Sequence, residues 1–244
     1  MGLAYFEAVR KVLEKVESTQ EESVKRAAQM LADAIVSGGM VYVFGASHAS
    51  IAAQELFYRA GGLVPINPIL APGLTTDVRP ITRTTHIERM SGYAEVLLRD
   101  VPIGSGDVLV VVSVSGRNAV PVEMAEEAGR RGAKVIAVTS LAYSKVVSSR
   151  APSGKLLYQV ADLVLDLCGD PGDAAVEIPG LKQRVGPTST VAAAVLLNAV
   201  VVETARELLA RGIEPPVFLS ANLDGADAHN ASLLARYSGR LTYM

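Results

Sequence analysis

Four short runs of β-branched and aliphatic residues, almost free of polar interruption, place the strongest limit on how this chain can fold. They span Met40–Phe44, Val108–Val114, Lys134–Thr139 and Leu163–Leu167. A strand with one face in water alternates apolar and polar residues, so these runs predict strands that are buried on both faces. A weaker run at Leu63–Asn67 predicts a fifth strand.

Stretches with helical spacing of apolar residues lie around and between these runs. Residues 1–37 predict one long or two short amphipathic helices, and further helices are predicted at Ser50–Ala60, roughly Glu88–Arg99, Ala119–Arg131 and Val191–Val202. Alternating strands and helices are typical of an α/β fold with three αβα layers. We predict a five-stranded parallel sheet of flavodoxin-like order 2-1-3-4-5.

The chain of 244 residues carries no linker, internal repeat or low-complexity tract that would divide it. We therefore predict one domain over residues 1–244. Its parts are N-terminal helices at 1–37, a core at 38–211 and a C-terminal helical extension at 212–244.

Charge and cysteine content limit the partners of the chain. With 23 basic and 25 acidic residues, the formal charge is −2, which argues against nucleic acid and membrane as partners. Cys168 is the one cysteine, so no internal disulfide and no zinc-ligand spacing is expected. The N-terminal residues lack the apolar core of a secretory signal, and Val191–Val202 is shorter than the roughly 20 residues of a membrane span. We expect a cytoplasmic protein without a metal.

In the predicted strand order, a crevice opens between the first and third strands at their carboxyl ends. The loops that follow these strands read GASHAS (Gly45–Ser50) and SVSGRN (Ser113–Asn118). Both combine glycine with hydroxyl groups at a strand-to-helix junction, where backbone N–H groups and the helix dipole favour an anion. Neither loop has the Walker or dinucleotide-binding glycine pattern, so ATP and NAD are not expected, and the predicted ligand is a phosphomonoester.

Small polar groups of the two loops are predicted to hold the phosphate: the side chains of Ser47, Ser113, Ser115 and Asn118, and the backbone N–H groups of Val114 and Gly116. Gly45 and Gly116 would let the backbone come close to the ligand. The alternative is that Ser47 and Ser115 only cap helices, as serine commonly does. A third cluster, Thr188-Ser189-Thr190, opens the apolar helix. We interpret it first as an N-cap, and as part of the binding site if that helix points at the crevice.

Together these motifs resemble the SIS, or sugar isomerase, domain superfamily. The resemblance rests on G-x-S from Gly45, S-x-S-G-x-N from Ser113, IAVTS after the fourth strand and VGPTST from Val185, and it covers nearly the whole chain. The segments Thr139–Arg150 and Pro215–Asn230 more closely resemble an uncharacterised bacterial family of sugar-isomerase-domain proteins, related to the phosphoheptose isomerases. The resemblance implies that the hydroxyl loops bind the phosphate of a phosphosugar.

Glu55 and Arg59 are one turn apart on the helix predicted after the first strand. By spacing alone they form a surface ion pair. Phosphoheptose isomerases, and the isomerase half of glucosamine-6-phosphate synthase, place an acid and a base at this separation in the corresponding helix. The resemblance therefore implies that Glu55 is the catalytic base and that Arg59 contacts the substrate. Aldose–ketose interconversion needs such a carboxylate, which moves a proton between adjacent carbons through an enediol.

Opening of the sugar ring needs a second acid or base, usually a histidine near neutral pH. His48 follows Ser47 in the first loop, His86 lies next but one to Glu88, and His229 lies in a loop that enters the last predicted helix. Each taken singly is more often an ordinary surface histidine. We assign His48 to substrate binding and His229 to catalysis.

The chain departs from the phosphoheptose isomerases in two places. Ile51 stands one turn before Glu55, where some of those enzymes have a zinc-binding histidine, and Val191–Val202 lacks their glutamine and histidine. Zinc-dependent isomerisation is therefore not expected. Arg79, Arg83 and Arg89 form a basic cluster, which we interpret as a solvated loop, with an arginine that reaches a sugar phosphate or carboxylate as the alternative.

The predicted function is a cofactor-independent aldose–ketose isomerase that acts on a sugar phosphate. The alternatives are a phosphosugar sensor without catalysis and a lyase or etherase, because the superfamily includes both; no DNA-reading segment is visible. The resemblance also implies a homo-oligomer, either a dimer or a dimer of dimers, whose site is completed by the His229 segment of a neighbouring subunit. A monomer with its last helix over its own crevice is the competing arrangement.

Overall fold

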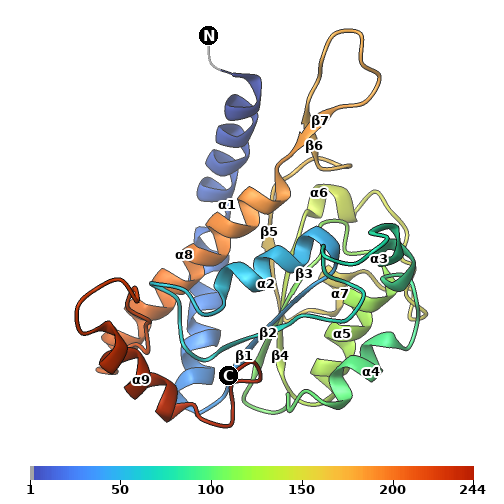
Figure 1. Ribbon diagram of the computed structural model, residues 1–244. Coiled ribbons are helices and arrows are strands. Elements are labelled where there is room, and N and C mark those ends of the chain that lie inside the picture. Colours follow the sequence, from blue (N-terminus) through green and yellow to red (C-terminus); the bar gives the residue numbers. More distant parts are fainter. Residues whose placement is uncertain (1–2) are drawn as a thin grey trace.

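The computed structural model describes residues 3–244 and contains a five-stranded parallel sheet (Figure 1). The strands are β1 (Val41–Gly45), β2 (Ile66–Ile69), β3 (Val108–Val112), β4 (Lys134–Thr139) and β5 (Leu163–Asp166). Their order is β2-β1-β3-β4-β5, which confirms the predicted flavodoxin-like topology. The ladder of β1 and β3 runs to the last residue of each strand, so the two ends are level.

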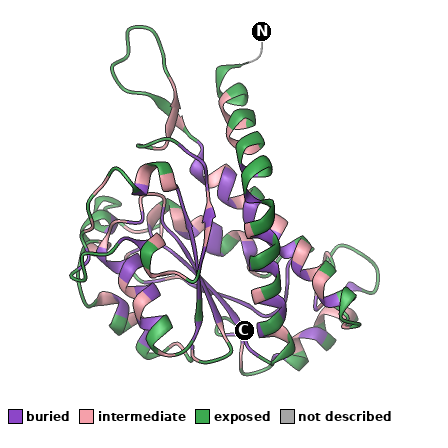
Figure 2. Ribbon diagram, turned by 180° about the vertical axis from the view of Figure 1, so that it is seen from behind, coloured by how far each residue is buried: buried purple, intermediate pink, exposed green. Residues whose placement is uncertain are grey.

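Alternate residues of the central strands enter two separate hydrophobic cores. In β1, Val41 and Val43 face one core, whereas Tyr42 and Phe44 face the other. This explains why the strand sequences show no polar alternation, and Figure 2 shows the central strands as buried along their length. Helices on both faces complete the αβα layers.

One face of the sheet is covered by α1 (Ala4–Val36), α2 (Ser50–Leu56) and α8 (Ser189–Ala210). The N-terminal region forms one helix of 33 residues, α1, which is the first of the two arrangements expected from its periodicity. Its apolar side chains from Val16 to Leu31 are buried against α8 and β5. Most of the apolar stripe on the N-terminal helix is therefore buried by contacts within the same chain.

The other face is covered by α4 (Tyr93–Arg99), α5 (Ala119–Arg130) and α7 (Leu157–Val160), with α9 (Ala226–Arg236) and the C-terminal segment beside β2. Three short helices lie in the connections: η1 (Ser47–Ala49), α3 (Thr82–Ile87) and α6 (Leu141–Ser144). Among residues 3–244, no helix combines the length and apolarity that a membrane span requires.

Several predicted boundaries were wrong. The helix expected at Glu88–Arg99 begins only at Tyr93, as α4, because the chain turns at Gly92, whose φ is 82°, and the short helix α3 ends before this range. The helix from Ser50 ends at Leu56, since Phe57 is already extended. The weak strand begins at Ile66 instead of Leu63.

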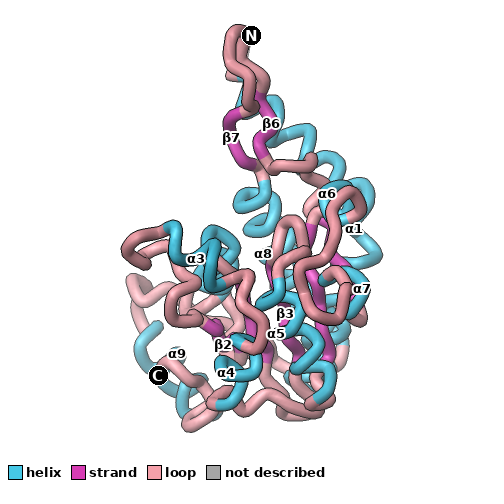
Figure 3. Tube along the Cα trace, turned by 90° about the vertical axis from the view of Figure 1, so that its right-hand side faces the viewer, coloured by secondary structure: helices cyan, strands magenta, loops and turns pink. Residues whose placement is uncertain are grey.

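A hairpin of β6 (Ala174–Val176) and β7 (Val185–Pro187) was not predicted. It projects beyond the sheet beside the N-terminal part of α1 (Figure 3). The Tyr5 hydroxyl of α1 donates to the Pro187 carbonyl oxygen at 2.7 Å, which ties the two projecting elements together.

Candidate functional site

A cavity of about 230 Å³ lies at the carboxyl ends of β1 and β3, where the strand order predicts a crevice. The two predicted loops and the first turn of α8 line it. Its polar lining residues are Ser47, His48, Glu88, Ser113, Ser115, Asn118, Tyr143, Asp173, Ser189 and Thr190. The fold thus brings together hydroxyl groups from four separate segments, with one histidine and two carboxyl groups.

Ser47, Ser113 and Ser115 have no capping role. The residues that precede η1 and α5 are Ala46 and Asn118, and neither helix start has a side-chain cap. Among the hydrogen bonds within residues 3–244, none uses the hydroxyl of any of these three serines. The interpretation of Ser47 and Ser115 as helix caps is therefore wrong, and all three hydroxyls are free to bind a ligand.

The two loop glycines have different roles. A Cβ at Gly45 would collide with the backbone of Ala49 and Ser50, so this glycine allows the tight turn from β1 into η1. Its expected role in ligand approach is replaced by this steric one. Gly116 has a φ of 59°, in the left-handed region that favours glycine. Within the described residues, the N–H groups of Val114 and Gly116 donate to no backbone acceptor outside helices and strands.

A carboxylate, rather than a hydroxyl, caps α8. Oδ1 of Asp173 accepts from the N–H groups of Thr188 at 3.1 Å and Ser189 at 2.8 Å, and Oδ2 accepts from the Ser189 hydroxyl at 2.5 Å. Thr188 does not line the cavity, and its hydroxyl is buried without a partner. The cap expected from Thr188 and Ser189 is therefore supplied by Asp173. Because this negative charge already occupies the helix terminus, a phosphate is better placed at the loops after β1 and β3.

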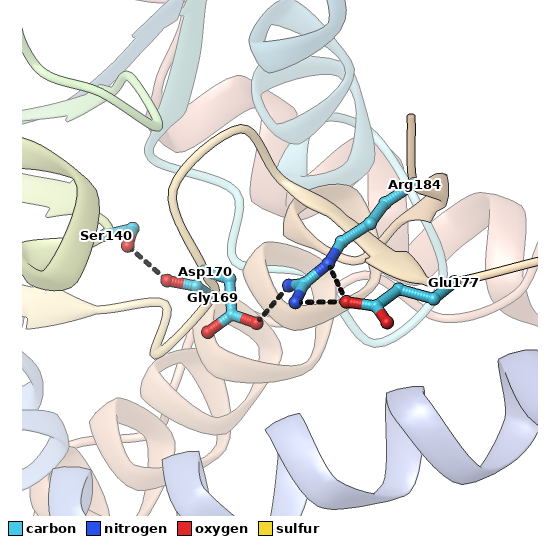
Figure 4. A network of polar contacts seen from close by, with 5 residues as sticks. All are labelled: Ser140, Gly169, Asp170, Glu177 and Arg184. Atoms are coloured by element: carbon cyan, nitrogen blue, oxygen red, sulfur yellow. Dashed lines mark hydrogen bonds and ion pairs between the residues drawn. The ribbon is translucent and has the colours of Figure 1, made fainter. Parts of the chain in front are cut away.

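The segment that carries Asp173 is fixed by the network in Figure 4. The Ser140 hydroxyl, after β4, donates to the carbonyl oxygen of Gly169 at 2.6 Å. Arg184 donates to Asp170 at 3.2 Å, and to Glu177 at 3.0 and 2.7 Å. These contacts hold both ends of the segment, one against the sheet and the other within the hairpin.

Glu88 is a cavity residue that sequence reasoning missed. It directly follows α3 and is half-buried. Burial raises the pKa of its carboxyl above the usual range, while the Asn118 amide and the Arg89 and Arg150 guanidiniums act in the opposite direction. A carboxyl with a raised pKa is suited to proton transfer near neutral pH. One weak signal in the sequence could have pointed to Glu88, namely an acid within a basic cluster.

Glu55 and Arg59 do not line the cavity of their own chain. They form an ion pair at the end of α2, with side chains 33% and 45% exposed. Oε1 of Glu55 also accepts a hydrogen bond from Nδ2 of Asn198, on α8, at 3.2 Å. Ala52, one turn earlier, does line the cavity. Within one chain, the surface ion pair is the arrangement that these two residues adopt.

Of the three histidines, His48 alone lines the cavity. His229 lies within α9, with Nε2 at 3.0 Å from the carbonyl oxygen of Val217. Val217 pairs with Leu63, ahead of β2, so α9 lies toward the amino ends of the strands and away from the cavity (Figure 1). The arrangement in which the last helix covers its own crevice is therefore wrong. Within residues 3–244, no three His, Cys, Asp or Glu side chains group in a way that could hold a metal ion.

Comparison with known proteins identifies relatives over the full fold. A family model described as an SIS domain matches residues 4–140. A UPF0309 protein of Shouchella clausii is 45% identical over 240 residues, which cover 98% of each chain. A UPF0309 protein of Streptomyces griseus is 41% identical and covers 98% of this chain and 96% of its own.

Solved structures share the fold at much lower identity. A phosphoheptose isomerase from Neisseria gonorrhoeae has a TM-score of 0.58 at 19% identity, and covers 83% of this chain and 96% of its own. The NanR protein of Vibrio vulnificus, complexed with ManNAc-6P, has a TM-score of 0.52 at 17% identity, and covers 85% of this chain and 64% of its own.

Proposed function

Since the chain belongs to the SIS-domain family, we propose that its cavity binds a phosphorylated sugar and interconverts the aldose and ketose forms of that sugar. The observation that carries this proposal is the set of three unpartnered serine hydroxyls beside backbone N–H groups at the ends of β1 and β3. Similar folds occur in a phosphoheptose isomerase and in a protein complexed with ManNAc-6P, which supports a phosphosugar as the ligand.

The phosphate is assigned to the hydroxyls of Ser47, Ser113 and Ser115 and the N–H groups of Val114 and Gly116. Several neutral donors around one anion compensate its charge through hydrogen bonds and the dipole of α5. His48 and Asn118, which also line the cavity, are assigned to the sugar hydroxyls. The Ser189 hydroxyl already donates a hydrogen bond to Asp173, so it helps to shape the cavity and is not a free donor for the ligand.

Proton transfer between the two carbons is assigned to Glu88. Its carboxylate would take the proton from the carbon beside the carbonyl group and return it to the neighbouring carbon, while the enediol forms and collapses. A raised pKa makes this carboxylate a stronger base than an exposed one. Ring opening needs a further group. For that step we retain Glu55 and His229, which can reach a cavity only across a subunit interface.

Exchange of carbon-bound hydrogen in deuterated water tests the proposal. Wild-type protein is incubated with glucose 6-phosphate, fructose 6-phosphate and erythrose 4-phosphate, and deuterium incorporation is followed by NMR. We expect Glu88→Gln to abolish exchange with all three, and Glu14→Gln, an exposed change on α1, to leave exchange unchanged. Glu55→Gln should retain exchange with erythrose 4-phosphate, because that sugar cannot close a ring.

Three other outcomes would redirect the assignment. Tight binding without exchange by the wild type identifies a sensor, a function favoured by the placement of Glu55 and His229 outside the cavity. Exchange followed by an eliminated product identifies a lyase or etherase. If Glu88→Gln keeps full activity and Glu55→Gln loses activity with every substrate, proton transfer between the two carbons is assigned to Glu55.

A further inference from the structure

Three arginines lie next to one another beside residues that line the cavity, outside the proposed phosphate site. Asn118 lines the cavity, and its Oδ1 accepts a hydrogen bond from Nη1 of Arg150 at 2.8 Å. The N–H group of Arg150 donates to the carbonyl oxygen of Arg117 at 2.7 Å, so the two arginines are joined through the backbone. Arg89 follows Glu88, another lining residue. We call Arg89, Arg117 and Arg150 the arginine rim.

Neutral oxygen atoms hold the guanidiniums of Arg117 and Arg150 in place. Arg117 donates to the carbonyl oxygen of Ser148 at 3.0 Å and to its hydroxyl at 3.3 Å. Across residues 3–244, no rim arginine forms an ion pair, whereas Arg59, Arg184 and Arg211 each do. The rim therefore has fixed donors, and Glu88 is the carboxylate that interacts with Arg89 and Arg150 without forming an ion pair.

The rim charges are close enough to act on one another. Desolvation, followed by the positive charges of Arg117 and Arg89, lowers the pKa of Arg150. Glu88 is the carboxyl that faces the rim and acts in the opposite direction on the pKa of Arg150, but its single negative charge faces three arginines. Binding an anion at the rim would relieve this repulsion.

The lining of the cavity places the rim beside a bound sugar phosphate. Glu88 and Asn118, which adjoin or contact rim arginines, line the same cavity of about 230 Å³ as Ser47, Ser113 and Ser115. With a phosphate at the serine loops, the far end of the sugar extends toward the rim. A planar guanidinium held there matches a carboxylate or a phosphate through paired hydrogen bonds.

We propose that the arginine rim binds a second anionic group of the ligand, so that the substrate class is a sugar phosphate that also carries a carboxylate or a second phosphate. This inference rests on the proposed function for the placement of the first phosphate. The serine loops would hold any phosphosugar, and the rim would select the acidic ones.

Calorimetric titration with three ligands on one scaffold tests the proposal. The probes are glucose 1-phosphate, glucuronic acid 1-phosphate and glucose 1,6-bisphosphate. We expect at least one of the two acidic ligands to bind the wild type about tenfold or more tightly than glucose 1-phosphate, the ratio that one added charge-assisted hydrogen bond provides. The acidic ligand that binds more tightly shows whether the rim binds a carboxylate or a phosphate.

Variants of the rim arginines test which residues cause this preference for acidic ligands. Arg150→Gln and Arg117→Gln should each bring the affinity ratio close to one, and Arg150→Lys should keep part of it. Arg236→Gln, at an exposed arginine of α9 far from the cavity, is the matched control and should keep the full ratio. Thermal melts followed by circular dichroism verify that each variant is folded. If Arg150→Lys keeps part of the preference, the loss in Arg150→Gln is due to the missing charge and not to a disordered loop.

Two results would overturn the proposal, and they are distinguishable. If the three sugars bind the wild type equally, the rim does not select acidic ligands, and the proposed function stands. If neither the sugars nor inorganic phosphate bind at millimolar concentration, the phosphate site fails as well, and the rim proposal fails with it.

Discussion

Ser115 combines a position in the cavity with a hydroxyl that has no partner among the described residues. We expect Ser115→Ala to weaken phosphosugar binding by about 1–3 kcal/mol, because one hydrogen bond to a charged group is lost. Titration calorimetry measures the change, and Ser18→Ala, on the exposed side of α1, is the control. Equal affinity of Ser115→Ala and the wild type for every sugar phosphate would remove this residue from the site.

Glu88 predicts a pH-dependent effect on stability. Its folded-state pKa is raised by burial, so near pH 3, where the carboxyl is protonated in both states, Glu88→Gln should change stability little. As pH rises above the ordinary glutamate value, the unfolded chain ionises first and wild-type stability falls. Glu88→Gln should therefore raise the melting temperature near pH 8 relative to the wild type. Melting curves at both pH values measure this, and an equal difference at the two would contradict the placement of Glu88.

The cavity residues differ in how far the sequence could predict them. Ser47, Ser113, Ser115 and Asn118 could be located because a parallel sheet of known order fixes which strand ends are neighbours. Asp173 belongs to an irregular segment after β5, where no periodicity constrains the path, and Glu88 ends a short helix in a similar one. Their arrival at the cavity depends on distant contacts such as those of Arg184.

At the scale of elements, buried Asn67 connects the edge strand β2 to the C-terminal segment. Its Nδ2 donates to the carbonyl oxygen of Arg240 at 2.9 Å, and its Oδ1 accepts from the N–H group of Thr242 at 2.9 Å. Asn67→Ala leaves both backbone groups without this partner, at a cost of about 1–3 kcal/mol. We expect faster amide hydrogen exchange in residues 237–244, measured by mass spectrometry. Asn222→Ala, in an exposed loop, should change neither stability nor exchange, and unchanged exchange in Asn67→Ala would show that the segment is held by other contacts.

The core strands could be predicted from their sequences, whereas the hairpin could not. In β1 and β3 every residue is buried, so composition alone marks the strands. The strands β6 and β7 have three residues each and no buried side chain. Their pairing is supported by the ion pairs of Arg184 within the hairpin segment and by Tyr5 of α1, whose contact with Pro187 joins segments far apart in the sequence. The predicted start of α4 at Glu88 is too early because the spacing of apolar residues does not reveal the turn at Gly92, whose φ is positive.

At the scale of the whole molecule, α8 has an apolar face that its own chain leaves open. Val195, Val202 and Leu209 are seven residues apart and 46%, 51% and 62% exposed. This spacing places them along one side of the helix, as in helices that pair with another helix. Asn198, which contacts Glu55, belongs to the same helix. A second copy of the chain seated on this face would therefore come close to Glu55, which is the arrangement expected for a site shared between subunits.

A shared site makes a prediction about mixed oligomers. Glu55 and His229 lie outside the cavity of their own chain, so they act on the ligand only if a neighbouring subunit brings them there. Glu88→Gln, in a residue of the cavity itself, and Glu55→Gln, in a residue that the neighbour supplies, should then each be inactive on glucose 6-phosphate. After mixing and exchange of subunits, a heterodimer has one site with intact Glu88 in the cavity and intact Glu55 from the neighbour, and activity should return to about a quarter of the wild-type level. Val202→Glu in both variants should prevent this recovery, because a charge on the apolar face separates the subunits, whereas Val96→Glu, at an equally exposed valine on α4, should not. A mixture that stays inactive at every ratio, with dimers present by light scattering, would show that Glu55 does not act in the cavity of a neighbouring subunit.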